Sequence, residues 1–456
     1  MQQATPAGPP TDSLASPLDA PSRQPAASDL GIYLHIPFCR RKCHYCDFNT
    51  YLPGSVAATG SPEGSSDPRP DPIPRYVDAL LMEISRAPSD AIAGSLFFGG
   101  GTPSMLPTGL VSRIVEFVAE RLRLPSGAEV TLEANPGDLT PEYLTGLRAA
   151  GINRLSIGVQ SLDDDKLRRL GRRHDVGTAR GAFEAAREAG FANVSLDLMF
   201  GLPGQTLDNW RGTLEAALGW RPEHFSLYCL TIEDGTPFAK WTASGRLVVP
   251  DDDTAADMYE AAQDLLGTAG YQQYEISNWA RRDEVLKSES GAPVRGTCRD
   301  DASQYQDDSQ SQRDWRGQHN LRYWRNQEYL GFGAGAYSSF RARRFADVRV
   351  PADYVRRLEA GTSVVDERES EPIDLPRAMS ETMFLGLRLT DEGVGLNTFR
   401  ARFGRDLLAV YAEAVADLLR LGLVEIAEVN AAGSAIRLTR RGRVLGNEVF
   451  QRFLPS

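Results

Sequence analysis

Three cysteines lie within eight residues near the start of the chain: Cys39, Cys43 and Cys46, in the run HIPFCRRKCHYC. Spacings of four and three residues, on a loop that leaves a strand, allow the three thiolates to face one metal centre. Cysteine thiolates bind both structural zinc and iron–sulfur clusters. A zinc site would need a fourth ligand, which His35 or His44 could supply. The cysteine spacing alone leaves both kinds of centre open.

Other polar residues follow later apolar segments. The glycines of FFGGGTP, at 97–103, would let the backbone approach a ligand and offer N–H groups to a carboxylate. Glu133 in LEANP could pair with an ammonium group or with ribose hydroxyls. Gln160 in GVQS, Arg172 in LGRRH and Asp197 in LDLMFGLP are further candidates. Taken singly, each also fits a turn, a cap or a surface position.

These residues need elements that bring them together. Short apolar segments alternate with helical ones and are predicted as strands at 31–37, 95–101, 129–135, 154–160, 194–203 and 224–230. Nearly continuous apolar strands of this kind favour a parallel sheet. Polar groups follow the first five strands, which favours a partial β/α barrel with its functional loops on one face. A doubly wound sheet would gather them at one switch point.

The chain divides into four predicted regions. Residues 1–30 are rich in Pro, Ala and Ser and are predicted to be a disordered tail, and 31–235 form the barrel core. That core contains a predicted disordered insert near 53–72. Residues 236–374 continue the unit and contain a second predicted disordered insert, at 281–315, and the HNLRYW motif. Residues 375–456 read as helix, helix and hairpin, which predicts a winged-helix-like α+β domain.

Composition restricts the class of protein. The 456 residues are 41% hydrophobic and 24% charged, without an apolar run of eighteen, so a soluble protein with no membrane span is expected. A net charge of −11 argues against a broad grip on nucleic acid, and the arginines at 437, 440, 441 and 443 are expected to form a solvated face. Five cysteines, three of them crowded together, are poor material for disulfides and indicate a reducing, cytoplasmic location.

The order of the motifs carries a resemblance. YLHIPFCxxKCxYC, GGGTP, LEANP, SIGVQS, LGRRH and DLMFGLPGQT together resemble the radical-SAM enzymes of the oxygen-independent coproporphyrinogen III oxidase family, over 31–456 apart from the inserts. The resemblance implies that Cys39, Cys43 and Cys46 bind three irons of a 4Fe-4S cluster. S-adenosylmethionine then chelates the fourth iron, and an electron cleaves it to a 5′-deoxyadenosyl radical.

Individual positions follow from the same resemblance. Tyr33, Gly100 and Glu133 match the family's contacts to the cluster-bound S-adenosylmethionine. The positions that hold a second S-adenosylmethionine in the oxidase are matched by Tyr45, Gly101, Thr102, Gln160, Arg172 and Asp197. Whether one or two molecules bind here is left open.

Two departures separate this chain from the oxidase. A fourth cysteine of the oxidase pattern is replaced by Phe48, in CDFNTY, which is similar to the HemW-type heme chaperones. The run HNLRYW, with His319, Asn320, Tyr323 and Trp324, matches the HNxxYW signature of that subfamily. Histidine is a common axial ligand of heme iron, so His319 is the expected heme ligand, although a buried histidine beside aromatic residues is also a common core residue.

The resemblance to that subfamily implies a heme chaperone that binds the cluster, S-adenosylmethionine and heme. Its partners would be heme-acceptor proteins and an electron donor for the cluster. The alternatives are the coproporphyrinogen III oxidase itself and another radical-SAM enzyme, such as a methyltransferase.

Overall fold

The computed structural model describes residues 29–56, 71–282, 313–429 and 433–455. The predicted N-terminal tail and the two predicted inserts lie largely outside these ranges. Their ends do not: β1 begins at Asp29, Arg281 belongs to β8, and Trp315 is 8% exposed. These three positions, assigned to the tail and the later insert from composition, are therefore folded.

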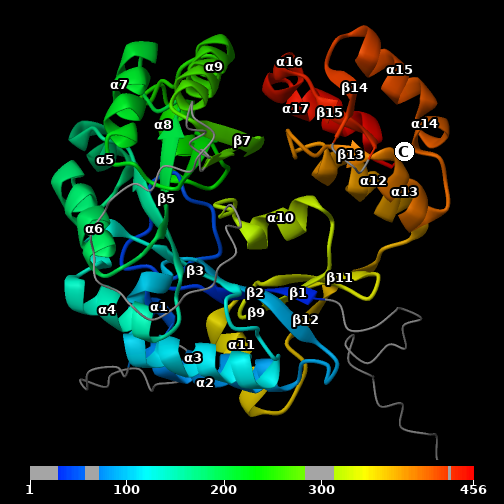
Figure 1. Ribbon diagram of the computed structural model, residues 1–456. Helices are drawn as coiled ribbons and strands as arrows, with labels where there is room; N and C mark the ends of the chain where they lie inside the picture. Colours follow the sequence, from blue (N-terminus) through cyan, green and yellow to red (C-terminus); the bar gives the residue numbers. More distant parts are fainter. Residues whose placement is uncertain (1–28, 57–70, 283–312, 430–432, 456) are drawn as a thin grey trace, which may run out of the picture.

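Most of the chain is built on one sheet (Figure 1). Strands β1 to β6 lie side by side in chain order and are parallel, and β9 pairs in parallel with the other edge of β1. The absence of any reversal among β1 to β6 excludes the doubly wound alternative. The predicted parallel β/α architecture is confirmed. The strands are β1 (Asp29–Ile36), β2 (Ile92–Gly100), β3 (Glu129–Ala134), β4 (Arg154–Gln160), β5 (Asn193–Phe200), β6 (His224–Cys229) and β9 (Tyr329–Phe332).

Antiparallel strands extend the sheet at both ends. β8 (Asn278–Arg281) and β7 (Tyr271–Glu275) continue it beyond β6. On the other side β9 is followed by β10 (Tyr337–Phe340), β11 (Arg343–Asp347) and β12 (Val365–Pro372). β12 and β7 are the two ends of the strand order, so the sheet remains open as a partial barrel.

Helices connect the parallel strands and cover the outer face of the sheet (Figure 1). In α2, Asp71 caps the first turn and the apolar residues Val77, Leu80 and Ile84 are fully buried against the sheet. The helices before the C-terminal domain are α1 (Pro53–Val56), α2 (Pro72–Ser85), α3 (Thr108–Arg121), α4 (Pro141–Ala149), α5 (Asp164–Leu170), α6 (Val176–Glu188), α7 (Leu207–Leu218), α8 (Pro237–Ala243), α9 (Asp252–Thr268), α10 (Gln318–Trp324) and α11 (Pro351–Glu359).

The C-terminal region has its own apolar core and lies beside the barrel, at the upper right of Figure 1. Helices and a three-stranded antiparallel sheet, ordered β13-β15-β14, make the predicted α+β domain. Its elements are α12 (Leu375–Gly386), β13 (Val394–Gly395), α13 (Leu396–Phe403), α14 (Leu407–Val410), α15 (Ala412–Arg420), β14 (Val424–Glu428), β15 (Ser434–Leu438), α16 (Arg440–Val444) and α17 (Gly446–Phe450).

The arginines of this domain do not all belong to its hairpin. Arg437 lies on β15 and pairs with Glu425, whereas α16 begins at Arg440, which pairs with Asp264 of the barrel. Arg443, also on α16, donates to Gln273. Arg437, Arg440 and Arg443 are therefore engaged in contacts within the chain.

The short helix α10, which carries the HNLRYW motif, lies between the sheet and the C-terminal domain (Figure 1) and contacts both β2 and α12. Among the described residues, no helix is long and apolar enough to cross a membrane.

Candidate functional site

A cavity of about 410 Å³ opens at the carboxyl ends of the parallel strands. Functional loops converge at this end of β/α sheets. The predicted cofactor residues that line it are Cys39, Cys43, Tyr45, Cys46, Gly100, Gly101, Thr102, Glu133, Gln160, Arg172 and Asp197. Residues up to 158 positions apart in the sequence therefore meet in one place, and Tyr33 is the predicted residue that does not line the cavity.

The cysteine loop follows β1 and is fixed by backbone hydrogen bonds. The Cys39 N–H donates to the Tyr51 carbonyl (3.0 Å) and the His44 N–H to the Leu170 carbonyl (3.0 Å). Burial raises the pKa of the Cys39 thiol and raises that of Cys46 to about 11. Thiolates in this environment need a nearby positive charge, which a bound metal centre supplies.

The zinc alternative finds little support in the geometry. His35 Nε2 bonds the Asn49 carbonyl (3.0 Å) and His35 Nδ1 the Tyr33 hydroxyl (3.1 Å), so both ring nitrogens are engaged. His44 Nδ1 bonds the Arg169 carbonyl (2.8 Å). Within the described residues, no three His, Cys, Asp or Glu side chains gather around a point that could hold one metal ion. The described residues therefore show no assembled site for a single zinc ion, and ligation of a cluster by the three cysteines stays a prediction.

Two glycines bring the backbone close to the cysteine loop. Gly100 has φ +105°, and a Cβ there would meet the His35 ring at 2.5 Å. A Cβ on Gly101 would meet the carbonyl oxygens of Ile36 and Phe38 at 2.7 Å. Only glycine combines this conformation with this approach, so the GGGTP motif is a structural requirement of the cavity wall.

Two half-buried carboxylates, Glu133 and Asp197, face the cavity. Burial and then the nearby Asp197 raise the pKa of Glu133 to about 8. Burial raises the pKa of Asp197 to about 6, although Asp197 accepts hydrogen bonds from Ser156 (2.9 Å) and Ser195 (3.2 Å). Carboxylates whose charge is so poorly compensated favour a ligand with positive charge or hydroxyl donors. The amino group, sulfonium and ribose of S-adenosylmethionine provide both.

Tyr33 lies behind the cavity wall. Its ring stacks near Phe97, with 6.2 Å between centroids, and its Cε2 would be 2.9 Å from a Cβ on Gly99. Burial and the charge of Glu133 raise the pKa of the Tyr33 hydroxyl. Tyr33 therefore supports the wall around Glu133, and a direct contact to a ligand stays a prediction.

Gln160 and Arg172 hold the far side of the cavity. Gln160 adopts φ +66°, a left-handed conformation that is uncommon outside glycine, where the β4–β5 register shifts. Arg172 donates to the Gly158 carbonyl (2.7 Å) and to Cys43 Sγ (3.6 Å). Arg172 thus links the end of β4 to the cysteine loop and places a positive charge beside a candidate cluster ligand.

His319 lies apart from this cavity and is 1% exposed. Its Nδ1 bonds the Ser95 hydroxyl (2.9 Å), its Nε2 bonds the Tyr323 hydroxyl (2.8 Å), and its ring stacks on Phe97. Burial, followed by the charges of Arg322 and Arg154, lowers its pKa to about 3. The ring is neutral, and neither nitrogen is free in this conformation.

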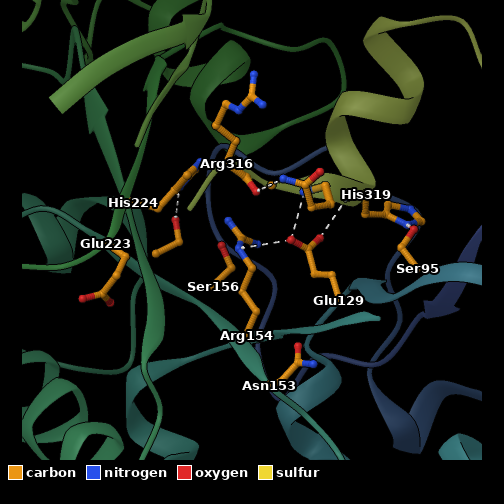
Figure 2. Close-up of polar contacts among 12 residues, drawn as sticks. Ser95, Glu129, Asn153, Arg154, Ser156, Glu223, His224, Arg316 and His319 are labelled. Atoms are coloured by element: carbon orange, nitrogen blue, oxygen red, sulfur yellow. Dashed lines mark hydrogen bonds and ion pairs between the residues drawn. The ribbon is translucent and has the colours of Figure 1, made fainter. Parts of the chain in front are cut away.

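A buried polar network supports the start of α10 (Figure 2). Glu129 accepts the N–H groups of Gln318 and His319, both at 2.9 Å, and lies between His319 and the buried Arg154. A carboxylate at this position satisfies two of the N–H groups that the first turn of a helix leaves unpaired.

A chain of hydrogen bonds joins the same helix to the cavity. The Gly317 N–H donates to the Tyr274 hydroxyl (3.1 Å), which contacts His224 Nε2 (2.8 Å). His224 Nδ1 contacts the Ser195 hydroxyl (2.8 Å), which donates to Asp197 (3.2 Å). If neutral His224 carries its proton on Nδ1, the Tyr274 hydroxyl donates to His224 Nε2, His224 Nδ1–H donates to Ser195, and Ser195 donates to Asp197. Figure 2 shows His224 within this network.

The sequence reasoning missed several cavity residues. Tyr228 and Cys229, at the end of β6, and Ser156, on β4, also line the cavity. For Tyr228 and Cys229 the position at a strand end, like that of Glu133, was the available signal, whereas Ser156 lies inside β4. Phe48, the residue in place of a fourth cysteine, lies on the cavity lining and is 62% exposed.

Known proteins match both parts of the chain. Residues 33–217 match the model of the Radical SAM superfamily, and residues 373–445 match that of the HemN C-terminal domain. Coproporphyrinogen III oxidase (HemN) from Escherichia coli has a similar fold, with a TM-score of 0.71 and 22% identity over 94% of this chain and 90% of that one.

Curated relatives are closer in sequence. The heme chaperone HemW of Bacillus subtilis is 36% identical over 92% of this chain and 98% of its own length. That of Escherichia coli is 35% identical over 76% of this chain and 80% of its own length. Identity at this level over nearly the whole length shows that the chain belongs to the HemW-type family of radical-SAM proteins.

Proposed function

We propose that this protein is a heme chaperone that carries a 4Fe-4S cluster and S-adenosylmethionine and passes heme to acceptor proteins. The main support is the similarity to relatives named heme chaperone HemW, which extends over 92% of this chain for the Bacillus subtilis protein. The exposed Phe48 adds a local argument, because this position of the cavity lining has no fourth thiol.

Cys39, Cys43 and Cys46 are the proposed cluster ligands, and Glu133 and Asp197 the proposed anionic contacts of S-adenosylmethionine. The glycines 100 and 101 and Thr102 would offer a close backbone wall, and Tyr45, Gln160 and Arg172 the opposite side. When bound, the cluster supplies electrons one at a time to S-adenosylmethionine. The chain's own contribution is to hold the thiolates, to orient the ligand between the carboxylates, and to limit access of water.

His319 stays the proposed heme ligand of the HNLRYW motif, with a structural condition attached. Ligation requires the Ser95 or Tyr323 hydrogen bond to break, so that one nitrogen can reach iron. Replacement of His319 by Ala should change the heme absorbance spectrum and leave the cluster absorbance intact. An unchanged heme spectrum would remove His319 from the site.

The experiment that separates chaperone from oxidase uses protein purified without oxygen and with its cluster rebuilt. Coproporphyrinogen turnover is assayed while heme is titrated by absorbance in parallel. The chaperone proposal expects heme binding without turnover. Turnover at ordinary enzyme rates, of about 1 s⁻¹ or more, would establish the oxidase alternative instead.

The Cys43→Ala variant tests the cluster separately. It should lose the broad visible absorbance of the rebuilt cluster, whereas Cys229→Ala, on the β6 edge of the same cavity, should keep it. Heme-acceptor proteins, an electron donor and a cytoplasmic location are part of the proposal. Heme transfer from the loaded protein to a heme-free acceptor is the direct assay.

A further inference from the structure

The proposed function requires space for a 4Fe-4S cluster, S-adenosylmethionine and heme. The cavity at the strand ends is small for all three. Its volume of about 410 Å³ is near the lower end of the roughly 300–1,000 Å³ typical of small-molecule sites. The cysteines and carboxylates on its walls suit the cluster and S-adenosylmethionine. A porphyrin therefore needs space elsewhere.

A second cavity, of about 730 Å³, lies between the end of α10 and the C-terminal domain. Trp324, the last residue of the HNLRYW motif, lines the cavity, and the Arg388 guanidinium lies over its ring at 4.3 Å from the centroid. Leu389, Val394 and Phe399 add apolar lining. The walls are fixed: the Asn326 amide donates to the Thr382 hydroxyl (3.1 Å), and Thr390 donates to the Gln273 carbonyl (2.7 Å). Large size and apolar walls suit a flat hydrophobic ring.

Positive charge also gathers at this cavity. Arg316, Arg325 and Arg402 line it, together with the carboxylates of Glu392 and Asp391. Arg316 and Arg325 share Glu392, at 3.0 and 2.6 Å. Among the described residues, Arg402 has no carboxylate partner within ion-pair distance, and its guanidinium donates to the Asn326 carbonyl (2.9 Å). In a chain with a net charge of −11, an excess of guanidinium groups beside an apolar cavity favours a ligand that bears carboxylates.

The described walls offer no usual ligand for heme iron. None of the described lining residues is a histidine, cysteine, methionine or tyrosine. His319 and Tyr323 contact Ser95, Phe97 and each other on the barrel side of α10, whereas Trp324 lines the cavity. Recognition here would depend on the ring and its carboxylates, and the axial positions of the iron would stay open for the ligand of an acceptor protein.

We propose that this cavity binds the porphyrin ring of heme between Trp324 and the C-terminal domain, with Arg402 binding a propionate. This binding mode is the alternative to ligation by His319 and leaves the iron without a protein ligand. This inference rests on the proposed heme-chaperone function and adds a location and a recognition mode to it. It predicts that metal-free protoporphyrin IX binds to the same site as heme.

The test uses the full chain with its cluster rebuilt, titrated with heme by absorbance and with protoporphyrin IX by fluorescence. Arg402→Glu should weaken both ligands by about tenfold or more, because it reverses the charge that meets the propionate. Arg400→Glu is the matched control: it lies on the same helix, pairs with Asp406 and does not line the cavity. It should leave both affinities within about twofold of the wild type.

A second variant fills the space. Thr398→Trp places an indole on the cavity wall and should weaken both porphyrins, whereas Asn397→Trp, next to it but outside the lining, should not. Unchanged cluster absorbance and unchanged thermal unfolding would show that a variant is folded. If both cavity variants unfold, competition of protoporphyrin IX with heme on the wild type decides: mutual exclusion supports the cavity, and independent binding refutes it.

The outcomes separate this inference from the function on which it rests. If the wild type binds neither porphyrin, the heme-chaperone function itself fails. If the wild type binds heme but not protoporphyrin IX, or if folded cavity variants bind heme like the wild type, the function survives and the cavity is refuted. Loss of heme binding in His319→Ala alone would place heme at the motif histidine.

Discussion

At the scale of single residues, the cavity combines groups that are costly to bury without a ligand. Burial raises the pKa values of Glu133, Asp197 and the Cys46 thiol, and the nearby Asp197 raises the pKa of Glu133 further. A protein retains such groups when a ligand compensates them. Substitution of these residues should therefore change the affinity for ligands more than the free energy of unfolding.

Glu133→Gln tests this expectation. It keeps the shape of the side chain and removes the charge, so we expect the affinity for S-adenosylmethionine to fall by about tenfold or more, as for a charge-assisted hydrogen bond of roughly 1.5–3 kcal/mol. Calorimetric titration of cluster-loaded protein measures it. Glu142→Gln, exposed on α4, is the control. Equal affinities for the wild type and Glu133→Gln would contradict the role.

The buried neutral ring of His319 predicts a pH effect on stability. Its pKa of about 3 in the folded protein lies below the value of about 6.5 in an unfolded chain. The unfolded state therefore binds more protons between these values, so the contribution of His319 is fully present above about pH 6.5 and is lost as the pH falls toward 3.

Urea unfolding of the wild type and His319→Gln from pH 7 to pH 4 measures this effect. The free energy of unfolding should fall less steeply with decreasing pH in the variant, since glutamine does not titrate. Parallel curves for the two proteins would show that the ring is not buried in its neutral form.

At the scale of elements, short hydrogen-bonded links hold α10 against the barrel. Glu129 at the start of β3 accepts two N–H groups from its first turn, and Tyr274 of β7 receives the Gly317 N–H. The Tyr274 hydroxyl also bonds His224, which bonds Ser195, which donates to Asp197. One hydrogen-bond network therefore connects the start of α10 with Asp197. Networks of this kind are stable when every member is satisfied.

Tyr274→Phe removes one hydroxyl from this network. Gly317 N–H and His224 Nε2 would each lose a buried partner, and we expect the free energy of unfolding to fall by about 1–3 kcal/mol. Chemical denaturation measures the change. Tyr51→Phe is the control, because that hydroxyl bonds an exposed carbonyl. A loss no larger in Tyr274→Phe than in the control would show that water replaces the hydroxyl.

At the scale of the whole molecule, the C-terminal domain meets the barrel around α10. Glu392 pairs with Arg316 before the helix and with Arg325 after it, and Arg388 pairs with Glu275 of β7 (3.4 Å). Partly exposed pairs of this kind contribute little to global stability. Their effect should be local, on how firmly α10 is held against the C-terminal domain.

Glu392→Ala is expected to loosen that contact and to leave the fold intact. Amide hydrogen exchange should become faster in residues 317–325 and stay unchanged in β3 to β5. Mass spectrometry of the exchanged protein measures both regions at once. Equal exchange in 317–325 would mean that apolar packing alone holds the helix.

Much of the barrel could be predicted from local patterns. β4 was predicted at 154–160 and is found there, and β6 was predicted one residue too long, because period and turn residues are properties of nearby sequence. The predicted boundaries of the tail and of the later insert were wrong for a physical reason. Asp29 and Trp315 are held by partners far away in the chain, which composition does not report.

The sequence by itself determined the cysteine trio, the glycine turn and the order of the polar residues that follow the strands, since each depends on short spacing. The tertiary structure decided how they combine. Only folding placed the predicted residues on one cavity and moved Tyr33 behind its wall. Only folding joined both nitrogens of His319 to hydroxyls from separate elements and turned Trp324 toward a second cavity, because burial and long-range contacts arise when distant segments pack together.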